Sequence, residues 1–126
     1  MSGSRKAIRW ETEGDVIVVS FTSDHIADEL YVQQARKELR SLANTVAGKM
    51  IVSLENVKFM ASAGLGILVE LHKLRQRANA QLKICDMRPL IRQTFTSAKI
   101  DRVLGIYDSK EEAMAAFEEE GEATTQ

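Results

Sequence analysis

The chain has 126 residues, 44% of them hydrophobic and 28% charged, with 17 basic and 18 acidic side chains and a net charge of −1. This length predicts a single domain, residues 1–126, with a core at about 7–118 and a frayed tail at 119–126. The balanced charge gives no broad attraction for nucleic acid or an anionic membrane, so neither partner is expected.

The composition also bears on the compartment. Cys85 is the only cysteine, which excludes an internal disulfide and suits a reducing environment. The first residues, "MSGSRKAIRW", lack the apolar core of a signal peptide, and no apolar run approaches the roughly 20 residues that cross a bilayer. A cytoplasmic protein is therefore expected.

The first predicted elements are a strand pair and a helix. Residues 7–13 ("AIRWETE") alternate apolar and charged side chains before a Gly14-Asp15 turn signal. Residues 15–22 ("DVIVVSFT") form a β-branched run typical of a central strand covered on both faces. Residues 27–46 then repeat apolar side chains every three or four positions, which predicts a helix.

The middle of the chain alternates strand and helix. Residues 49–57 ("KMIVSLENV") and 81–87 ("QLKICDM") are predicted strands, and the apolar side of residues 63–78 predicts a helix between them. Pro89 suits the first turn of a third helix, because its missing N–H would be unpaired there.

The C-terminal part adds one more strand and helix. Residues 102–108 ("RVLGIYD") predict the last strand, and Ser109 followed by Glu112 predicts a capping box for a helix over 110–120. The order ββαβαβαβα predicts an α/β domain with four main helices. Its sheet is expected to be mostly parallel, with about five strands and one antiparallel strand at the start.

Three loops are expected to meet at the carboxyl edge of this sheet, where binding sites of such folds usually lie. They are Ser23–Ile26, Phe59–Ala63 and Asp86–Arg88. The second loop belongs to the stretch "VKFMASAGLGIL", which holds a lone serine, Ser62, between a strand and a helix. Serine is a preferred helix N-cap, so a purely structural cap is one interpretation, with Gly64 and Gly66 as packing residues.

Catalytic and cofactor interpretations are weaker. A nucleophile elbow would need glycine where Met60 stands, and a serine hydrolase would need a histidine base from only His25 and His72. The "GLG" triplet lacks the spacing and the lysine of a phosphate-binding loop. Without clustered cysteine, histidine and carboxylate ligands, no metal or other cofactor is expected.

Modification is the remaining interpretation of Ser62. Between Ser53 and Thr94 no other residue carries a hydroxyl side chain, and a helix start is accessible to a kinase. Phosphorylation adds about −1.5 to −2 charge units. A helix N-terminus tolerates that charge, whereas a partner protein packed on the same edge does not. A phosphate could thus break a complex without unfolding the domain.

Two segments resemble a known family. "VSLENVKFMASAGLGILVEL" resembles the signature of STAS domains, specifically bacterial anti-sigma factor antagonists, and "RPLIRQTFTSAKIDRVLGIYDSKEEAMAAF" resembles the family's C-terminal part. The resemblance spans about residues 7 to 118. It implies that Ser62 is the phosphoacceptor and Gly64 the turn glycine. Ala61 stands where an acidic residue is common, and Ala63 replaces a second hydroxyl.

The resemblance further implies a partner surface. Asp24 corresponds to an aspartate in the loop before the first helix, and Leu65 lies at the start of the second. We expect Asp24, Ala61, Ala63, Gly64 and Leu65 to contact the partner, with Arg88 and Arg92 at its margin.

The function implied is a partner switch. The unmodified antagonist would bind an anti-sigma factor that is also a serine kinase, which releases a sigma factor; phosphorylation would expel the antagonist, and a serine phosphatase would reset it. The chain would then be no enzyme. A STAS scaffold or transport-accessory subunit that works without phosphorylation, and a serine hydrolase, are the alternatives.

Overall fold

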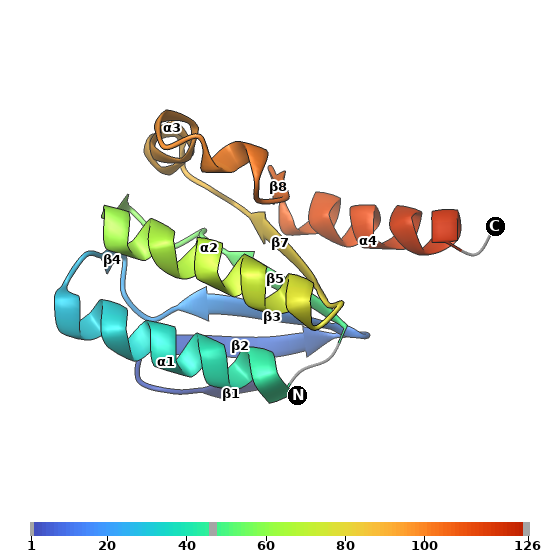
Figure 1. Cartoon of the computed structure of the whole chain (residues 1–126), viewed down its shortest axis with the longest axis horizontal. Helices are drawn as coiled ribbons and strands as arrows, with labels where there is room; N and C mark the ends of the chain where they lie inside the picture. The colour runs from blue at the N-terminus through green and yellow to red at the C-terminus, as the bar shows by residue number, and fades with distance from the viewer. Residues whose placement is uncertain (1, 46–47, 125–126) are drawn as a thin grey trace.

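The computed structural model describes residues 2–45 and 48–124, arranged as a sheet with helices on both faces (Figure 1). The main sheet has six strands in the spatial order β1 (Ser2–Ser4), β2 (Ile8–Glu13), β3 (Val16–Phe21), β5 (Lys49–Ser53), β7 (Gln81–Cys85) and β8 (Ile106–Tyr107). The first three pair antiparallel and the rest parallel. The predicted fold class is confirmed, with an additional strand at the N-terminal edge.

Helices cover the two faces unequally. Helices α1 (Glu29–Thr45), α2 (Ser62–Arg77) and α3 (Pro89–Ser97) bury their apolar sides against one face, and α1 and α2 run side by side in Figure 1. Helix α4 (Lys110–Thr124) covers part of the other face. Because side chains alternate along a strand, β3 sends Ile17 and Val19 to the first core and Val16 and Val18 to the second. This explains the continuous apolar run of β3.

Short strands form where loops were predicted. β4 (His25–Ile26) pairs in parallel with β6 (Phe59–Met60) as a separate two-stranded sheet. β1 was also not predicted, because Ser2–Ser4 has no apolar alternation. Conversely, the predicted strand 102–108 shrinks to β8, since a 3₁₀ turn occupies Ile100–Arg102.

Helix ends differ from prediction by a few residues. The Asp28 carboxylate accepts a hydrogen bond of 3.0 Å from the Tyr31 amide, so α1 begins at Glu29, and the predicted end at residue 46 lies outside the described residues. Helix α4 continues to Thr124, past its expected end, and the last two residues of the expected frayed tail are not described. Ser109 Oγ accepts from the Glu112 amide at 3.1 Å, whereas the Glu112 carboxylate reaches the Asp108 amide, not that of Ser109.

In the part of the chain that the structure describes, no helix has the length and apolar character needed to span a membrane.

Candidate functional site

Ser62 is the first residue of α2, at the carboxyl edge of the sheet. The N-cap position belongs to Ala61, with φ −79° and ψ 168° and no side-chain cap bond. The Ser62 side chain is exposed, and its hydroxyl forms no hydrogen bond with any residue of the described ranges 2–45 and 48–124. The prediction of a structural cap is therefore wrong, because the helix begins one residue earlier than a Ser62 cap requires. The hydroxyl is free for an external group.

Three backbone hydrogen bonds fix the turn that carries Ser62. The Ala61 amide donates to the Ile26 carbonyl at 3.0 Å, and the Ala61 carbonyl accepts from the Gly64 and Leu65 amides at 2.9 and 3.1 Å. A Cβ at Gly64 would lie 3.0 Å from the Ile26 carbonyl oxygen and 2.8 Å from Met60 Cγ. Gly64 thus permits close packing of α2 on β4. Its φ is not positive, so the glycine is required by this close contact and not by the backbone conformation.

Gly66 is different. It is exposed, and a Cβ built there would meet no atom within 4 Å. The hypothesis that Gly66 is a packing residue within the domain is wrong.

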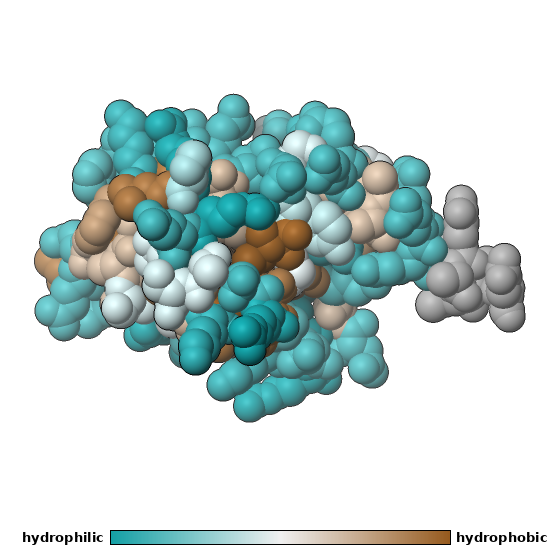
Figure 2. All heavy atoms as spheres, turned by 90° about the horizontal axis from the view of Figure 1, so that it is seen from above, coloured by the Kyte–Doolittle hydropathy of each residue, from teal (hydrophilic) through white to brown (hydrophobic). Residues whose placement is uncertain are grey.

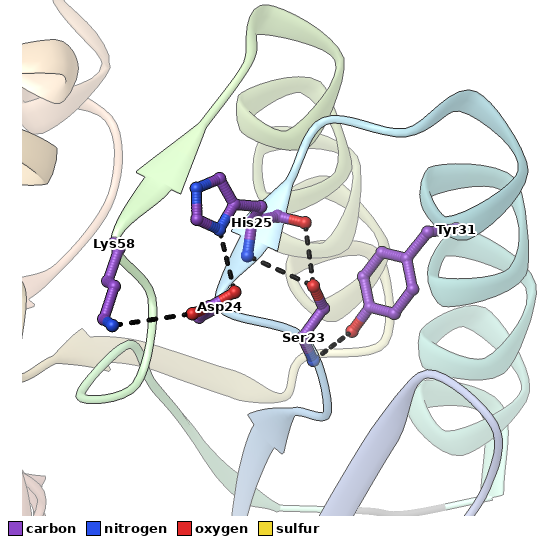
Figure 3. Close-up of polar contacts among 5 residues, drawn as sticks. All are labelled: Ser23, Asp24, His25, Tyr31 and Lys58. Atoms are coloured by element: carbon purple, nitrogen blue, oxygen red, sulfur yellow. Dashed lines mark hydrogen bonds and ion pairs between the residues drawn. The ribbon is translucent and has the colours of Figure 1, made fainter.

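The Asp24 loop is held against β6 (Figure 3). The Asp24 carbonyl accepts from the Lys58 and Phe59 amides at 2.7 and 3.2 Å, and its carboxylate contacts His25 Nδ1 at 2.8 Å and Lys58 Nζ at 3.7 Å. The hydrogen bond from His25, with the nearby charges of His25 and Lys58, holds the pKa of Asp24 below its ordinary value. Asp24 therefore presents a negative charge beside β6 at neutral pH.

Tyr31 fixes the other side of this loop. Its hydroxyl accepts from the Thr22 and Ser23 amides, both at 3.2 Å, and donates to the Ala7 carbonyl at 2.6 Å. Ser23 Oγ closes a local turn, accepting from the His25 amide at 3.1 Å and donating to the His25 carbonyl at 3.0 Å (Figure 3). The sequence analysis did not identify Tyr31 or Lys58, because their positions in the sequence do not indicate that they contact the Asp24 loop.

Two of the three predicted loops come together. The β4–β6 pairing joins Ser23–Ile26 to Phe59–Ala63 directly. The third loop, Asp86–Arg88, is tied instead to the end of β5 and the residues after it, because Asp86 accepts from Ser53 Oγ at 3.2 Å and Arg88 Nε donates to the Glu55 carbonyl at 3.2 Å.

The other predicted residues divide by exposure. Ala63 is exposed and Ala61 half-buried, so both are within reach of a partner. Leu65 is only 7% exposed and belongs to the core, so its predicted contact with a partner is not available to its side chain. Gly64 is also buried. Arg92 is exposed and pairs with Asp108 at 2.6 Å, on the side of α3.

Exposed apolar side chains add to this edge. Phe59 is 45% exposed, and its ring centroid lies 6.1 Å from that of His25. Leu90, on the first turn of α3, is 57% exposed, and α3 contacts β6. Figure 2 shows apolar side chains in two places on this face, toward the end of the molecule that holds α3 and near its middle. We call Asp24, Phe59, Ser62, Ala63 and Gly66 the Ser62 surface; it combines one charge, one aromatic ring and small residues.

This geometry does not support hydrolysis. Within the described residues neither histidine hydrogen-bonds to Ser62, and His25 Nδ1 is engaged by Asp24. The described residues also contain no group of three or more histidine, cysteine and carboxylate side chains that could hold a metal ion. A Ser-His pair, which activates a serine nucleophile, is missing there.

Comparison with known proteins gives a consistent family. The STAS domain family model matches residues 8–113. The chain is 24% identical to the anti-sigma F factor antagonist of Paenibacillus polymyxa over 114 residues, covering 88% of this chain and 94% of the relative. Its fold is similar to an anti-sigma-factor antagonist (STAS) domain protein of Planctomyces limnophilus, with a TM-score of 0.78, 24% identity and coverage of 90% and 99%.

A further structural neighbour is the anti-sigma factor antagonist SpoIIAA of Bacillus, solved in unphosphorylated and phosphorylated forms. Both forms give a TM-score of 0.64 at 18% identity; they cover 87% of this chain, and 96% and 98% of the respective neighbour chains.

Proposed function

Because the chain belongs to the STAS domain family, we propose that it is an anti-sigma factor antagonist, which binds an anti-sigma factor serine kinase through the Ser62 surface and thereby frees a sigma factor. In this proposal the kinase phosphorylates Ser62, the modified antagonist dissociates, and a serine phosphatase restores it. The chain is a substrate and a binding module, and it works in the cytoplasm. The observation that carries the proposal is the exposed Ser62 hydroxyl without a partner among the described residues.

The local structure suits a phosphate that leaves the fold intact. The amides of Ser62 and Ala63 begin α2, and neither donates to a carbonyl of the described residues. Such amides, with the helix dipole, stabilise an anion. No packed side chain has to move, since the hydroxyl already faces solvent.

The same phosphate would oppose a docked partner. It adds about −1.5 to −2 charge units to a surface that already carries the Asp24 carboxylate. Lys58 Nζ and His25 are already engaged with Asp24, so they compensate the new charge incompletely. Burying this added negative charge against a partner is costly unless that partner supplies cations. Dissociation follows from local charge, with no change of fold.

The direct experiment is phosphorylation in vitro. The protein is incubated with magnesium, ATP and anti-sigma factor kinases of its own organism, and the phosphorylated residue is located by mass spectrometry. We expect one phosphate at Ser62, none in Ser62→Ala, and retained kinase binding by Ser62→Ala. Labelling elsewhere with Ser62 unmodified would contradict the proposal.

Binding by Ser62→Asp tests the charge mechanism. We expect weaker binding with nearly unchanged thermal unfolding. Gln76→Glu is the matched control, since it adds one charge on an exposed position of α2 about 21 Å further along the helix axis. If Ser62→Asp binds a partner as tightly as the unmodified chain, the alternative of a STAS scaffold or transport-accessory subunit replaces the switch. Labelling of Ser62 by a fluorophosphonate would indicate a hydrolase.

A further inference from the structure

A basic hollow of about 560 Å³ lies between the β1–β2 connection and α1. Its lining residues are Ser4, Arg5, Lys6, Trp10, Gln34, Lys37, Glu38 and Ser41. Three of these are cations, and within residues 2–45 and 48–124 none of the three forms an ion pair. The hollow therefore concentrates positive charge on a chain whose net charge is −1.

The single carboxylate of the hollow is already engaged. Glu38 is 4% exposed, and its Oε1 accepts from the Ala7 and Ile8 amides at 2.9 and 3.2 Å. Its Oε2 accepts from the Gln34 side chain. Glu38 thus fastens the start of β2 to α1, and the three cations stay available to an external anion.

The hollow continues along α1. A second hollow of about 420 Å³ is lined by Gln33, Arg36, Lys37, Arg40, Ser41 and Asn44, so it shares Lys37 and Ser41 with the first. Arg36 and Arg40 both pair with Glu70, leaving two cations for one carboxylate. The two hollows form an open basic trough (the lining residues of both) along one side of α1. An elongated trough fits an extended chain better than a compact ion.

One end of the trough, at the β1–β2 connection, lies close to the Asp24 loop of the Ser62 surface. The carbonyl of Lys6 accepts from Thr22 Oγ1 at 2.9 Å, and Tyr31 OH joins the Ala7 carbonyl to the Ser23 amide. The β1–β2 connection and the Asp24 loop are therefore held together at the same end of the sheet. A protein bound at the β1–β2 connection is therefore close to the Asp24 loop.

We propose that the basic trough binds an acidic, extended segment of the protein partner, and that this segment belongs to the anti-sigma factor, an assignment that rests on the proposed function. Attraction by unpaired lysines acts at a distance and is screened by salt. The trough therefore attracts the partner and slows its dissociation, whereas the charge on the Ser62 surface controls whether the partner binds there. Because Ser62 is not among the lining residues, phosphorylation leaves the trough competent.

Trp10 provides the assay. It is the only tryptophan of the chain, it lines the trough, and the Arg5 guanidinium lies 6.0 Å from its ring centroid. The full chain is titrated at low ionic strength with a synthetic ten-residue glutamate-rich peptide, and Trp10 fluorescence is recorded. We expect a saturable change that weakens as salt is added. The glutamine analogue of the peptide should give none.

Charge reversal localises the site. Lys6→Glu with Lys37→Glu is expected to weaken peptide binding roughly tenfold or more, since two attractive charges become repulsive. The matched control is Lys73→Glu with Arg102→Glu, two exposed cations outside the trough carrying the same total charge change. Equal loss in both double variants, or no saturable signal in the unmodified chain, would overturn the proposal.

Two further titrations separate the occupants. Tighter binding of pyrophosphate would make the trough a small-anion site, and tighter binding of oligouridylate would make it a nucleic-acid site; either result overturns the acidic-peptide assignment. Ser62→Asp is expected to bind the peptide like the unmodified chain. Peptide binding is therefore tested independently of Ser62 phosphorylation. A result that contradicts the acidic-peptide proposal can be distinguished from one that contradicts the phosphorylation switch.

Discussion

Two glycines of α2 should respond in opposite directions to the same added methyl group. In Gly64→Ala the new Cβ would lie 2.8 Å from Met60 Cγ, 2.9 Å from Ile26 Cγ2 and 3.0 Å from the Ile26 carbonyl oxygen. That carbonyl also holds the Ala61 amide, so α2 has to shift away from β4 or the bond has to stretch. Overpacking of this kind costs about 1–3 kcal/mol, partly offset by about 0.5–1 kcal/mol from replacing a helical glycine.

Gly66→Ala has the gain from replacing a helical glycine without the cost of overpacking. Its Cβ meets nothing within 4 Å, so we expect a gain of about 0.5–1 kcal/mol in the free energy of unfolding. For Gly64→Ala the two terms together predict a loss in the free energy of unfolding of up to about 2.5 kcal/mol. Urea unfolding followed by circular dichroism measures both. Shifts of the two midpoints in the same direction would refute this account of the helix contacts.

The Gly66 variant also tests the surface. If a partner backbone approaches α2 closely beside Ser62, Gly66→Ala should bind more weakly although it is more stable. Calorimetric titration with the anti-sigma factor separates these two effects. Unchanged affinity would remove Gly66 from the Ser62 surface.

Three further predictions concern the loop and the core. Tyr31→Phe removes the hydroxyl that joins three backbone groups, so the free energy of unfolding should fall by about 1–3 kcal/mol. Hydrogen exchange of the Ser23 amide should also become faster. Carboxyl NMR titration should give Asp24 a pKa below its ordinary 3.8, and His25→Gln should raise it. Since a depressed pKa favours the folded state above the unfolded pKa, this contribution is lost as pH falls through the folded value, below 3.8. Burial raises the pKa of the Cys85 thiol, so iodoacetamide at pH 8 should label it only in the unfolded chain; native labelling at the unfolded rate would contradict this.

The regular elements were predictable because their sequences carry strong hydrophobic patterns, either a continuous apolar run or a helical spacing. The run Val16–Phe21 is buried on both faces of the sheet, and the helical spacing of Val32, Ala35 and Leu39 places all three in one core. The pairing of β4 with β6 was not predictable. Two-residue strands carry no period, and their partners lie far apart in the chain.

The turn that carries the candidate site was predictable, but its detail was less so. Ser62 lies between a strand and a helix as predicted, yet the prediction of the helix start is uncertain by about one residue, and that residue decides whether its hydroxyl is a cap or a free group. Leu65 was placed on the surface although it precedes the buried Leu68 by three positions, a spacing that indicates the same helix face. The basic trough had no linear signal, since β strands and a helix from separate segments build it.

The hydrogen-bonded pairing of His25–Ile26 with Phe59–Met60 sets a limit on how such proteins diverge. An insertion in either stretch would break the pairing and change where Ser62 lies relative to the Asp24 loop. We therefore do not expect related proteins to differ in loop length at this place. If the proposed function holds, we expect the choice of partner to depend on the identities of a few outward-facing side chains, and alignments across residues 24–26 and 59–64 should contain substitutions but no gaps.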